Sequence, residues 1–149
     1  MYKGIYCLFL RNSSCTVTIG ALGPVRFDAG WHVYIGSALG PGGLARVRRH
    51  LRYSGGEGGR PRWHIDYLLR HPSFAPGCTC CAGTNETLEC RIAESVGGTP
   101  VPRFGSSDCD CRSHLFHFQE FPKDRIESAF RSLGLVPIIT MLNTNEGQS

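Results

Sequence analysis

The sequence predicts an α+β fold: a small, mostly antiparallel central sheet of three strands, flanked by helices and followed by a C-terminal strand-helix extension. Two observations carry this prediction. Strand-like runs crowd together near the N-terminus, and strands joined by so few residues can pair only as antiparallel neighbours. Helical periodicity begins after these runs, so the helices are expected to pack against the sheet.

The strands are predicted from side-chain type and from alternation. Residues 3–11 are rich in β-branched and aromatic side chains, and residues 15–20 alternate between polar and apolar types. Segment 23–30 carries turn-forming residues at both ends, which indicates part of a hairpin. Residues 31–38, "WHVYIGSA", are predicted to be the third strand of the sheet.

A glycine-rich turn ends this strand and a helix follows it. In "LARVRRHLR", which begins at Leu44, apolar residues recur at helical spacing and form one stripe. Arg46 and His50 are four residues apart and share an adjoining face of that helix. A flexible loop is expected at 53–61, and a short helix or turn at 62–72 ends at a proline.

The second half of the chain is predicted to be looser. Residues 75–84 are cysteine-rich and expected to be irregular. Capping residues and periodicity then predict, in order, a helix at 85–98, a strand at 114–121, an amphipathic helix at 123–134 and a last strand at 135–140. We expect one domain over residues 1–142 and a flexible tail at 143–149.

Composition and charge narrow the class of protein. Hydrophobic residues make up 41% of the chain, which predicts a folded domain. The net charge is only +4, but Lys3 and Lys123 are the only lysines among 16 basic residues, and arginine suits phosphate better than lysine does. No apolar run approaches the roughly 20 residues of a membrane span, so we expect a cytoplasmic protein without a membrane partner. There, the eight cysteines are expected to be thiols or metal ligands rather than disulfides.

Four side chains are candidates for phosphodiester chemistry. Tyr34 lies near the end of a predicted strand, and the next helix presents Arg46 and His50 one turn apart. These groups can bind and polarise a phosphodiester, but they lack a metal ligand. Glu89 can supply it, because it falls within the apolar stripe of the predicted helix 85–98, where an unpaired carboxylate is costly. A hard cation such as Mg²⁺ suits that carboxylate.

The order of these motifs resembles the GIY-YIG nuclease superfamily. "GIY" occupies 4–6, "YIG" occupies 34–36, and an arginine stands four residues before a histidine in the following helix. Within the superfamily, the chain is most similar to a GIY-YIG-like family of unknown function that is found alone or fused to an endonuclease III-type repair glycosylase. The stretches that carry this similarity are "YIGSALGPGGLARVRRHLR" from Tyr34, "RWHIDYLL" from Arg62, "ECRIA" from Glu89 and "FGSSDCDCRSHLF" from Phe104. The resemblance covers roughly residues 3–118.

The resemblance implies hydrolysis of a DNA phosphodiester at one divalent metal ion, Mg²⁺ or Mn²⁺. Tyr6 would act as the general base for water, or would position that base, and Tyr34 would support it by hydrogen bonding. Arg46 would stabilise charge on the transferring phosphate, and His50 would assist at the same face. Glu89 would hold the metal.

Further polar residues have two interpretations each. Three arginines either contact DNA phosphates or form a solvated face: Arg48, Arg49 and Arg52. Arg62 is a further candidate for a DNA contact. His64 either lines the same cleft or makes only local contacts. Three residues are placed in a polar loop folded over the active face: Ser107, Asp108 and His114.

The cysteines of the second half have a zinc interpretation as well. Cys109, Cys111 and His114 would ligate zinc together with a fourth residue. The candidates for that fourth ligand are Cys90, Cys78, Cys80 and Cys81. Cys7 and Cys15 lie on predicted strands and are most simply buried thiols.

The leading hypothesis is therefore a metal-dependent DNA endonuclease that acts in DNA repair or processing, with DNA and a repair protein as partners. One alternative is a nucleic-acid-binding module with an inactive nuclease site. Another is an interaction domain stapled by structural zinc, in which the arginines are incidental.

Overall fold

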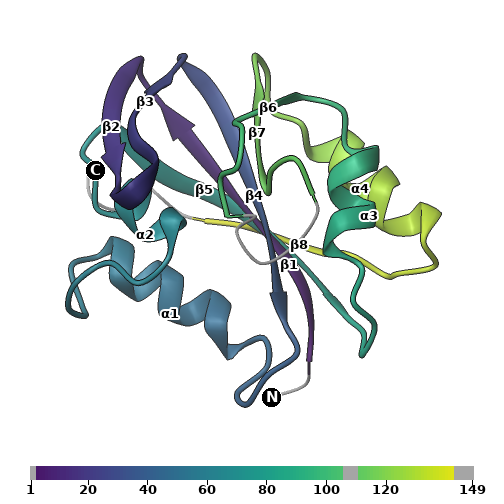
Figure 1. Cartoon of the computed structure of the whole chain (residues 1–149). Coiled ribbons are helices and arrows are strands. Elements are labelled where there is room, and N and C mark those ends of the chain that lie inside the picture. Colours follow the sequence, from purple (N-terminus) through teal and green to yellow (C-terminus); the bar gives the residue numbers. More distant parts are fainter. Residues whose placement is uncertain (1–2, 106–110, 143–149) are drawn as a thin grey trace.

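A six-stranded antiparallel sheet forms the centre of the computed structural model, which describes residues 3–105 and 111–142 (Figure 1). In spatial order the strands are β6 (Thr99–Pro100), β7 (Leu115–Phe118), β4 (Gly30–Ala38), β1 (Gly4–Asn12), β5 (Phe74–Gly83) and β8 (Ile138–Met141). The α+β class is confirmed, whereas the expected sheet of three strands is wrong, because later segments of the chain add strands at both edges.

Two predicted strands lie outside the central sheet. β2 (Cys15–Ile19) and β3 (Gly23–Phe27) pair only with each other, across the short 3₁₀ helix η1 (Gly20–Leu22). Their buried side chains Val17, Ile19 and Phe27 share a core with Leu8 of β1. The hairpin therefore packs over one face of the sheet, where burial of its apolar side favours it more than pairing at an edge.

β1 pairs with β4 on one side and with β5 on the other. β5 lies in the segment that was expected to be irregular. Glycine and proline hide this strand in the sequence, because both are depleted in strands. In the structure, Cys78, Cys80 and Ala82 are buried on one face of β5, where the thiols act as small apolar groups.

Four helices cover the two faces of the sheet (Figure 1). α1 (Ala45–Ser54) and α2 (His64–Leu69) share a core with one face, and α3 (Glu89–Ser95) and α4 (Lys123–Ser132) share a core with the other. The helices expected at 44–52 and 123–134 are thus confirmed. The helix expected at 85–98 is shorter in the structure: its N-cap residue is Leu88, and it ends at Ser95.

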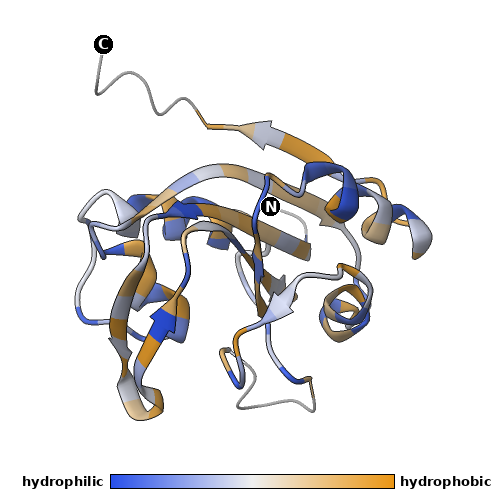
Figure 2. Cartoon of the chain, turned by 90° about the horizontal axis from the view of Figure 1, so that it is seen from above, coloured by the Kyte–Doolittle hydropathy of each residue, from blue (hydrophilic) through white to orange (hydrophobic). Residues whose placement is uncertain are grey.

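The alternation of β1 decides which side chains reach which core. Tyr6, Leu8 and Leu10 face the core under α1 and α2, and Ile5, Cys7 and Phe9 face the core under α3 and α4. At the outer edge, β8 carries exposed Ile138 and Met141, seen as the partly hydrophobic outermost strand of Figure 2. No helix in the described ranges is both long and apolar enough to cross a membrane.

The register of β1 and β4 brings the two tyrosine motifs together. Tyr6 lies opposite Gly36 in the antiparallel pair. A Cβ atom on Gly36 would overlap the Tyr6 ring, so this position requires glycine for the ring to lie flat across β4. The glycine of "YIG" therefore makes room for the tyrosine of "GIY".

Candidate active site

Five of the sequence-predicted site residues meet in one cleft of about 230 Å³: Tyr6, Tyr34, Arg46, Glu89 and His114. It is lined by Tyr6, Tyr34, Gly36, Ser37, Arg46, Trp63, Glu89, Gly105 and His114. β1, β4, α1 and the start of α3 each contribute at least one of these side chains. Residues separated in sequence by more than half of the chain thus converge on one small, polar space.

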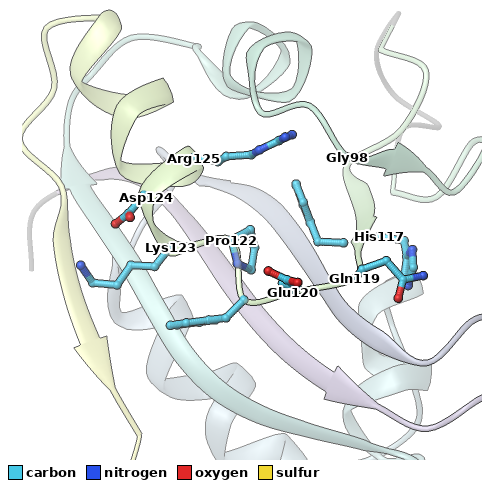
Figure 3. A pocket seen from close by; sticks show the side chains of 10 residues that line it. Gly98, His117, Gln119, Glu120, Pro122, Lys123, Asp124 and Arg125 are labelled. Carbon is cyan, nitrogen blue, oxygen red and sulfur yellow. The ribbon is translucent and has the colours of Figure 1, made fainter.

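A wider hollow of about 610 Å³ lies at the start of α4 (Figure 3). Its charged lining side chains are Glu120, Lys123, Asp124 and Arg125, so both signs of charge are present. Lys123 is already paired with Glu127 at 3.0 Å. None of the sequence-predicted site residues lines this hollow, and we place the candidate site in the smaller cleft, where polar groups converge.

Tyr6 of the cleft forms a buried hydrogen-bonded pair with His50, which is not among the residues that line the cleft. The Tyr6 hydroxyl lies 2.8 Å from His50 Nε2, and both residues are almost fully buried. Burial lowers the pKa of His50 to about 4, an effect that the nearby Asp66 charge opposes. His50 is therefore neutral at pH 7, and its Nε2 accepts a hydrogen bond from the phenol when Nδ1 carries the proton.

Both phenols of the cleft hold their protons firmly. Burial raises the pKa of Tyr6 well above its usual value, and nearby Tyr34 adds to this, whereas Arg46 opposes it by its charge and a hydrogen bond. Burial likewise raises the pKa of Tyr34 to about 12, again opposed by Arg46. The Glu89 and Asp66 charges raise the pKa of Tyr34 further. Neither phenol is thus a ready-made base, and Tyr6 needs a proton acceptor such as His50.

Arg46 is placed in the first turn of α1 and extends into the cleft. Its Nη1 donates a hydrogen bond of 2.8 Å to the carbonyl of Ser37, which fixes the side chain against the end of β4. Within the described part of the chain, no carboxylate forms an ion pair with it. Its charge is therefore available to an anion that enters the cleft.

Trp63 is a cleft residue that the sequence analysis missed. The guanidinium carbons of Arg46, Arg49 and Arg62 lie 5.3, 4.4 and 5.5 Å from the centre of its ring. Three cations thus share one indole ring through cation–π contacts. Trp63 precedes a short helix and belongs to no periodic pattern, so only its arginine-rich neighbourhood in the sequence hinted at this role.

The other two predicted arginine contacts lie apart from Trp63. Arg48 is exposed on α1. Arg52 is exposed as well, and its Nε lies 3.8 Å from Glu57 Oε1. A surface pair of this kind is weak, so both side chains remain able to reach a phosphate.

Glu89, the first residue of α3, fits the expected metal ligand. Its Oε1 atom is buried and makes no hydrogen bond to any described residue. A buried carboxylate oxygen without a donor is costly, and a hard divalent cation removes that cost. His114 lines the same cleft, and burial lowers its pKa while the Glu89 charge opposes the shift. The buried Oε1 atom of Glu89 is thus one oxygen ligand of the kind that a hard divalent cation takes.

His64 and Asp66 act on the cleft indirectly. His64 Nδ1 accepts a hydrogen bond of 2.8 Å from the backbone N–H of Gly105, a residue that lines the cleft. Asp66 is fully buried, and its Oδ2 accepts hydrogen bonds from the backbone N–H groups of Arg62 and Trp63 at 2.8 and 3.1 Å. Both side chains thus fix loops that shape the cleft. The two other residues expected on this face, Ser107 and Asp108, lie outside the described residues.

Comparison with known families gives one match. The family described as Domain of unknown function DUF123 matches residues 5–135. The chain belongs to the DUF123 family. The match spans the residues from Tyr6 to His114, so every cleft residue of this DUF123 chain lies within it. No curated protein and no solved structure matches the chain.

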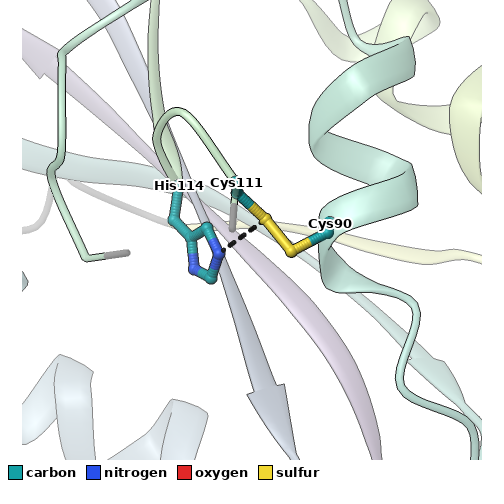
Figure 4. The surroundings of a disulfide bond; sticks show 3 residues. All are labelled: Cys90, Cys111 and His114. Atoms are coloured by element: carbon teal, nitrogen blue, oxygen red, sulfur yellow. Dashed lines mark hydrogen bonds between the residues drawn. A yellow bond between two sulfur atoms is a disulfide. The ribbon is translucent and has the colours of Figure 1, made fainter. Parts of the chain in front are cut away.

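The cysteines of the DUF123 chain depart from the expectation of free thiols. Cys90 of α3 and Cys111 form a disulfide, with Cα atoms 5.6 Å apart (Figure 4). His114 Nε2 lies 3.3 Å from the Sγ atom of Cys111. The possible metal-ligand atoms of Cys90, Cys111 and His114 all lie within 4.8 Å of one another. Local spacing in the sequence does not reveal this pair, because the two residues meet only through the fold.

The remaining zinc candidates lie elsewhere or are not described. Cys78, Cys80 and Cys81 are free thiols on β5. Cys109 lies outside the described residues. The DUF123 chain therefore gathers only Cys90, Cys111 and His114 of the predicted zinc ligands within the ranges that the structure describes.

Proposed function

We propose that this chain is a metal-dependent DNA endonuclease of the GIY-YIG type, which hydrolyses a phosphodiester bond in DNA repair or processing alongside a repair protein. The observation that carries the proposal is the convergence of Tyr6, Tyr34, Arg46 and Glu89 in one cleft. A guanidinium, two phenols and a partly buried carboxylate suit an anionic substrate and a cation better than a neutral substrate. The motifs of the sequence single out the same four residues.

Glu89 would hold Mg²⁺ or Mn²⁺ through its buried, unbonded Oε1 atom. When bound, such a cation supplies Lewis-acid stabilisation of the charge on phosphate oxygens. Tyr34 lies near enough for the Glu89 charge to raise its pKa, so its neutral hydroxyl can orient a water or a phosphate oxygen beside that position. Ring packing against Tyr6, at 6.4 Å between centroids, keeps that hydroxyl in place.

Tyr6 and His50 would move the proton of the attacking water. With His50 protonated at Nδ1, the Tyr6 hydroxyl would donate its hydrogen to His50 Nε2, which leaves the phenol oxygen able to accept a hydrogen from water. As water attacks phosphorus and the P–O bond to the leaving oxygen breaks, water would pass one proton to the Tyr6 oxygen and Tyr6 would pass its own to His50 Nε2. The leaving oxygen would take a proton from solvent. The nearby Asp66 carboxylate favours the resulting imidazolium. This relay avoids a free phenolate, which burial disfavours.

Arg46 would stabilise the negative charge that develops on the transferring phosphate. Its hydrogen bond to the Ser37 carbonyl fixes the guanidinium before substrate arrives, so little reorganisation accompanies the reaction. An interaction that strengthens as charge develops lowers the barrier more than it raises affinity.

Arg49, Arg62 and Trp63 would hold the DNA strand next to the cleft. The two arginines carry charge to within 5.5 Å of the indole centre, and Trp63 also lines the cleft. Like charges gathered around one ring repel one another until a polyanion neutralises them. A DNA backbone provides phosphates at the required density, and the indole offers a flat face to a base or sugar.

The same arginine cluster also favours a second candidate, a nucleic-acid-binding module without cleavage. It would bind DNA through the contacts around Trp63 even if the chemistry at Tyr6 failed. The two candidates differ in turnover and not in affinity.

Incubation of the purified protein with branched, nicked and duplex DNA separates them. The nuclease proposal expects cleavage of at least one substrate with Mg²⁺ or Mn²⁺ and none with a chelator. Binding of all three without cleavage under any metal would overturn it in favour of the binding module. Loss of cleavage in Arg46→Ala, with binding retained, ties the activity to this cleft rather than to a contaminant.

A further inference from the structure

The Cys90–Cys111 bond connects the two segments that form one edge of the cleft (Figure 4). Cys90 directly follows Glu89 in α3, and Cys111 lies three residues before His114. Glu89 and His114 both line the cleft. The bond therefore joins the segment that carries the metal ligand to the segment that carries the facing imidazole.

This pair differs from the buried cysteines of the core in its accessibility, and it shares its half-buried position with the free thiols Cys15 and Cys81. Cys90 and Cys111 are half-buried, so a solvent reagent can reach them. Cys7, Cys78 and Cys80 are fully buried, and burial raises the pKa of the Cys78 thiol to about 11. Oxidants and reductants should thus act on the Cys90–Cys111 pair and leave the core thiols unchanged.

A covalent bond beside Glu89 adds to the core packing of Ile92 and Ala93 that holds α3 against the sheet. The helix has only seven residues, and helices this short are marginal without tertiary support. Glu89 is its first residue, where fraying is greatest. A covalent bond at the next residue fixes that first turn against the segment before β7.

We propose that Cys90 and Cys111 form a reversible thiol–disulfide site that controls the geometry of the Glu89 edge. Peroxide is the oxidant: the two thiols and one hydrogen peroxide give one disulfide and two waters, as the O–O bond breaks and both thiol protons enter the waters. A dithiol reductant restores the thiols by exchange and becomes a disulfide itself. The effect on cleavage rests on the proposed nuclease function, but the bond and its effect on the cleft do not.

The test compares the peroxide-oxidised and the reduced forms of the full chain. Peptide mass mapping after thiol alkylation identifies the bond, and melting temperature and Mn²⁺ binding report on the fold and on the cleft. We expect a Cys90–Cys111 bridge in the oxidised form only. Reduction should lower the melting temperature by on the order of 5 °C or more, because the bond closes a separation of 21 residues. Mn²⁺ affinity and DNA cleavage should each fall several-fold.

Two variants isolate the pair. Cys90→Ser should behave like the reduced protein under both conditions. Cys81→Ser, which changes another half-buried cysteine on β5, should keep the full redox response. An equal response of the two variants would overturn the assignment.

Four further outcomes decide the proposal. The proposal would be overturned if Cys90 and Cys111 remained thiols after treatment with peroxide. It would also be overturned if the reduced chain held one equivalent of zinc that Cys90→Ser lost. An enzyme that cleaves DNA equally well in both forms would overturn it while leaving the nuclease function intact. A mapped bond with redox-dependent Mn²⁺ binding, but without cleavage in either form, would support this site and overturn the nuclease function instead.

Discussion

Replacement of Tyr6 by phenylalanine tests the proposed proton relay with little change in shape. The ring would keep its packing across Gly36, and only a hydroxyl that lies 2.8 Å from His50 Nε2 would be lost. That hydroxyl is buried, so the substitution leaves one ring nitrogen of His50 without its partner.

Two magnitudes follow from this geometry. Loss of a buried neutral hydrogen bond costs about 1–2 kcal/mol of unfolding free energy, which corresponds to a fall of roughly 3–8 °C in melting temperature for a chain of this size. Removal of the group that passes the proton should slow cleavage on the order of 10²- to 10⁴-fold. The variant should therefore be folded and slow.

Single-turnover cleavage and thermal melting measure these two effects, and Tyr53→Phe is the matched control. Tyr53 is also buried and donates its hydroxyl to the Gly59 carbonyl at 3.0 Å, but it lies outside the cleft. Its loss should cost a similar stability and leave the cleavage rate within a few-fold of the parent. If Tyr6→Phe cleaved DNA at the parent rate, the relay would be refuted. If Tyr6→Phe and Tyr53→Phe slowed cleavage equally, the slowing would result from lost stability and not from a lost proton relay.

Three more predictions follow from the structure. Arg46→Ala should slow single-turnover cleavage on the order of 10²-fold or more. Its DNA affinity, measured by fluorescence anisotropy, should stay within a few-fold of the parent, and a variant that lost affinity but kept its cleavage rate would contradict this. Arg62→Ala should lower the slope of log affinity against log salt by about 0.9, whereas Arg131→Ala on α4 should not change it. Burial lowers the pKa of His32 to about 3 and that of His50 to about 4, so between about pH 6.5 and pH 5 only the unfolded chain takes up these two protons. These two histidines should therefore lower the free energy of unfolding by about 4 kcal/mol between pH 7 and pH 5. Denaturant titrations of the parent and of His32→Gln measure this loss, and a variant that keeps the full pH dependence would contradict it.

The sequence predicted those parts of the fold that local patterns determine. The strands of the two tyrosine motifs and the helix that carries Arg46 and His50 follow from periodicity and turn residues within a few positions. The position of Glu89 at the cleft also followed from a local pattern, since a carboxylate within an apolar stripe demands a partner.

Features that depend on distant partners were missed. The strand β5 is stabilised by pairing with β1 and by burial of its cysteines, and neither is visible in its own composition. The pairing of Cys90 with Cys111 and the gathering of arginines around Trp63 likewise require segments far apart in sequence. The strands expected at 15–20 and 23–30 formed, but their place over one face of the sheet depends on a core shared with other elements.

The Mg²⁺-dependent cleavage rate of Glu89→Gln, compared with that of Glu94→Gln, tests the central claim most directly. The two residues lie on the same helix, but Glu89 lines the cleft and Glu94 is exposed to solvent. A neutral amide is a poor ligand for a hard cation, so Glu89→Gln should show no cleavage above the level measured with a chelator, and Glu94→Gln should cut DNA at the parent rate. Cleavage by Glu89→Gln at the parent rate would contradict a metal-dependent nuclease site in this cleft.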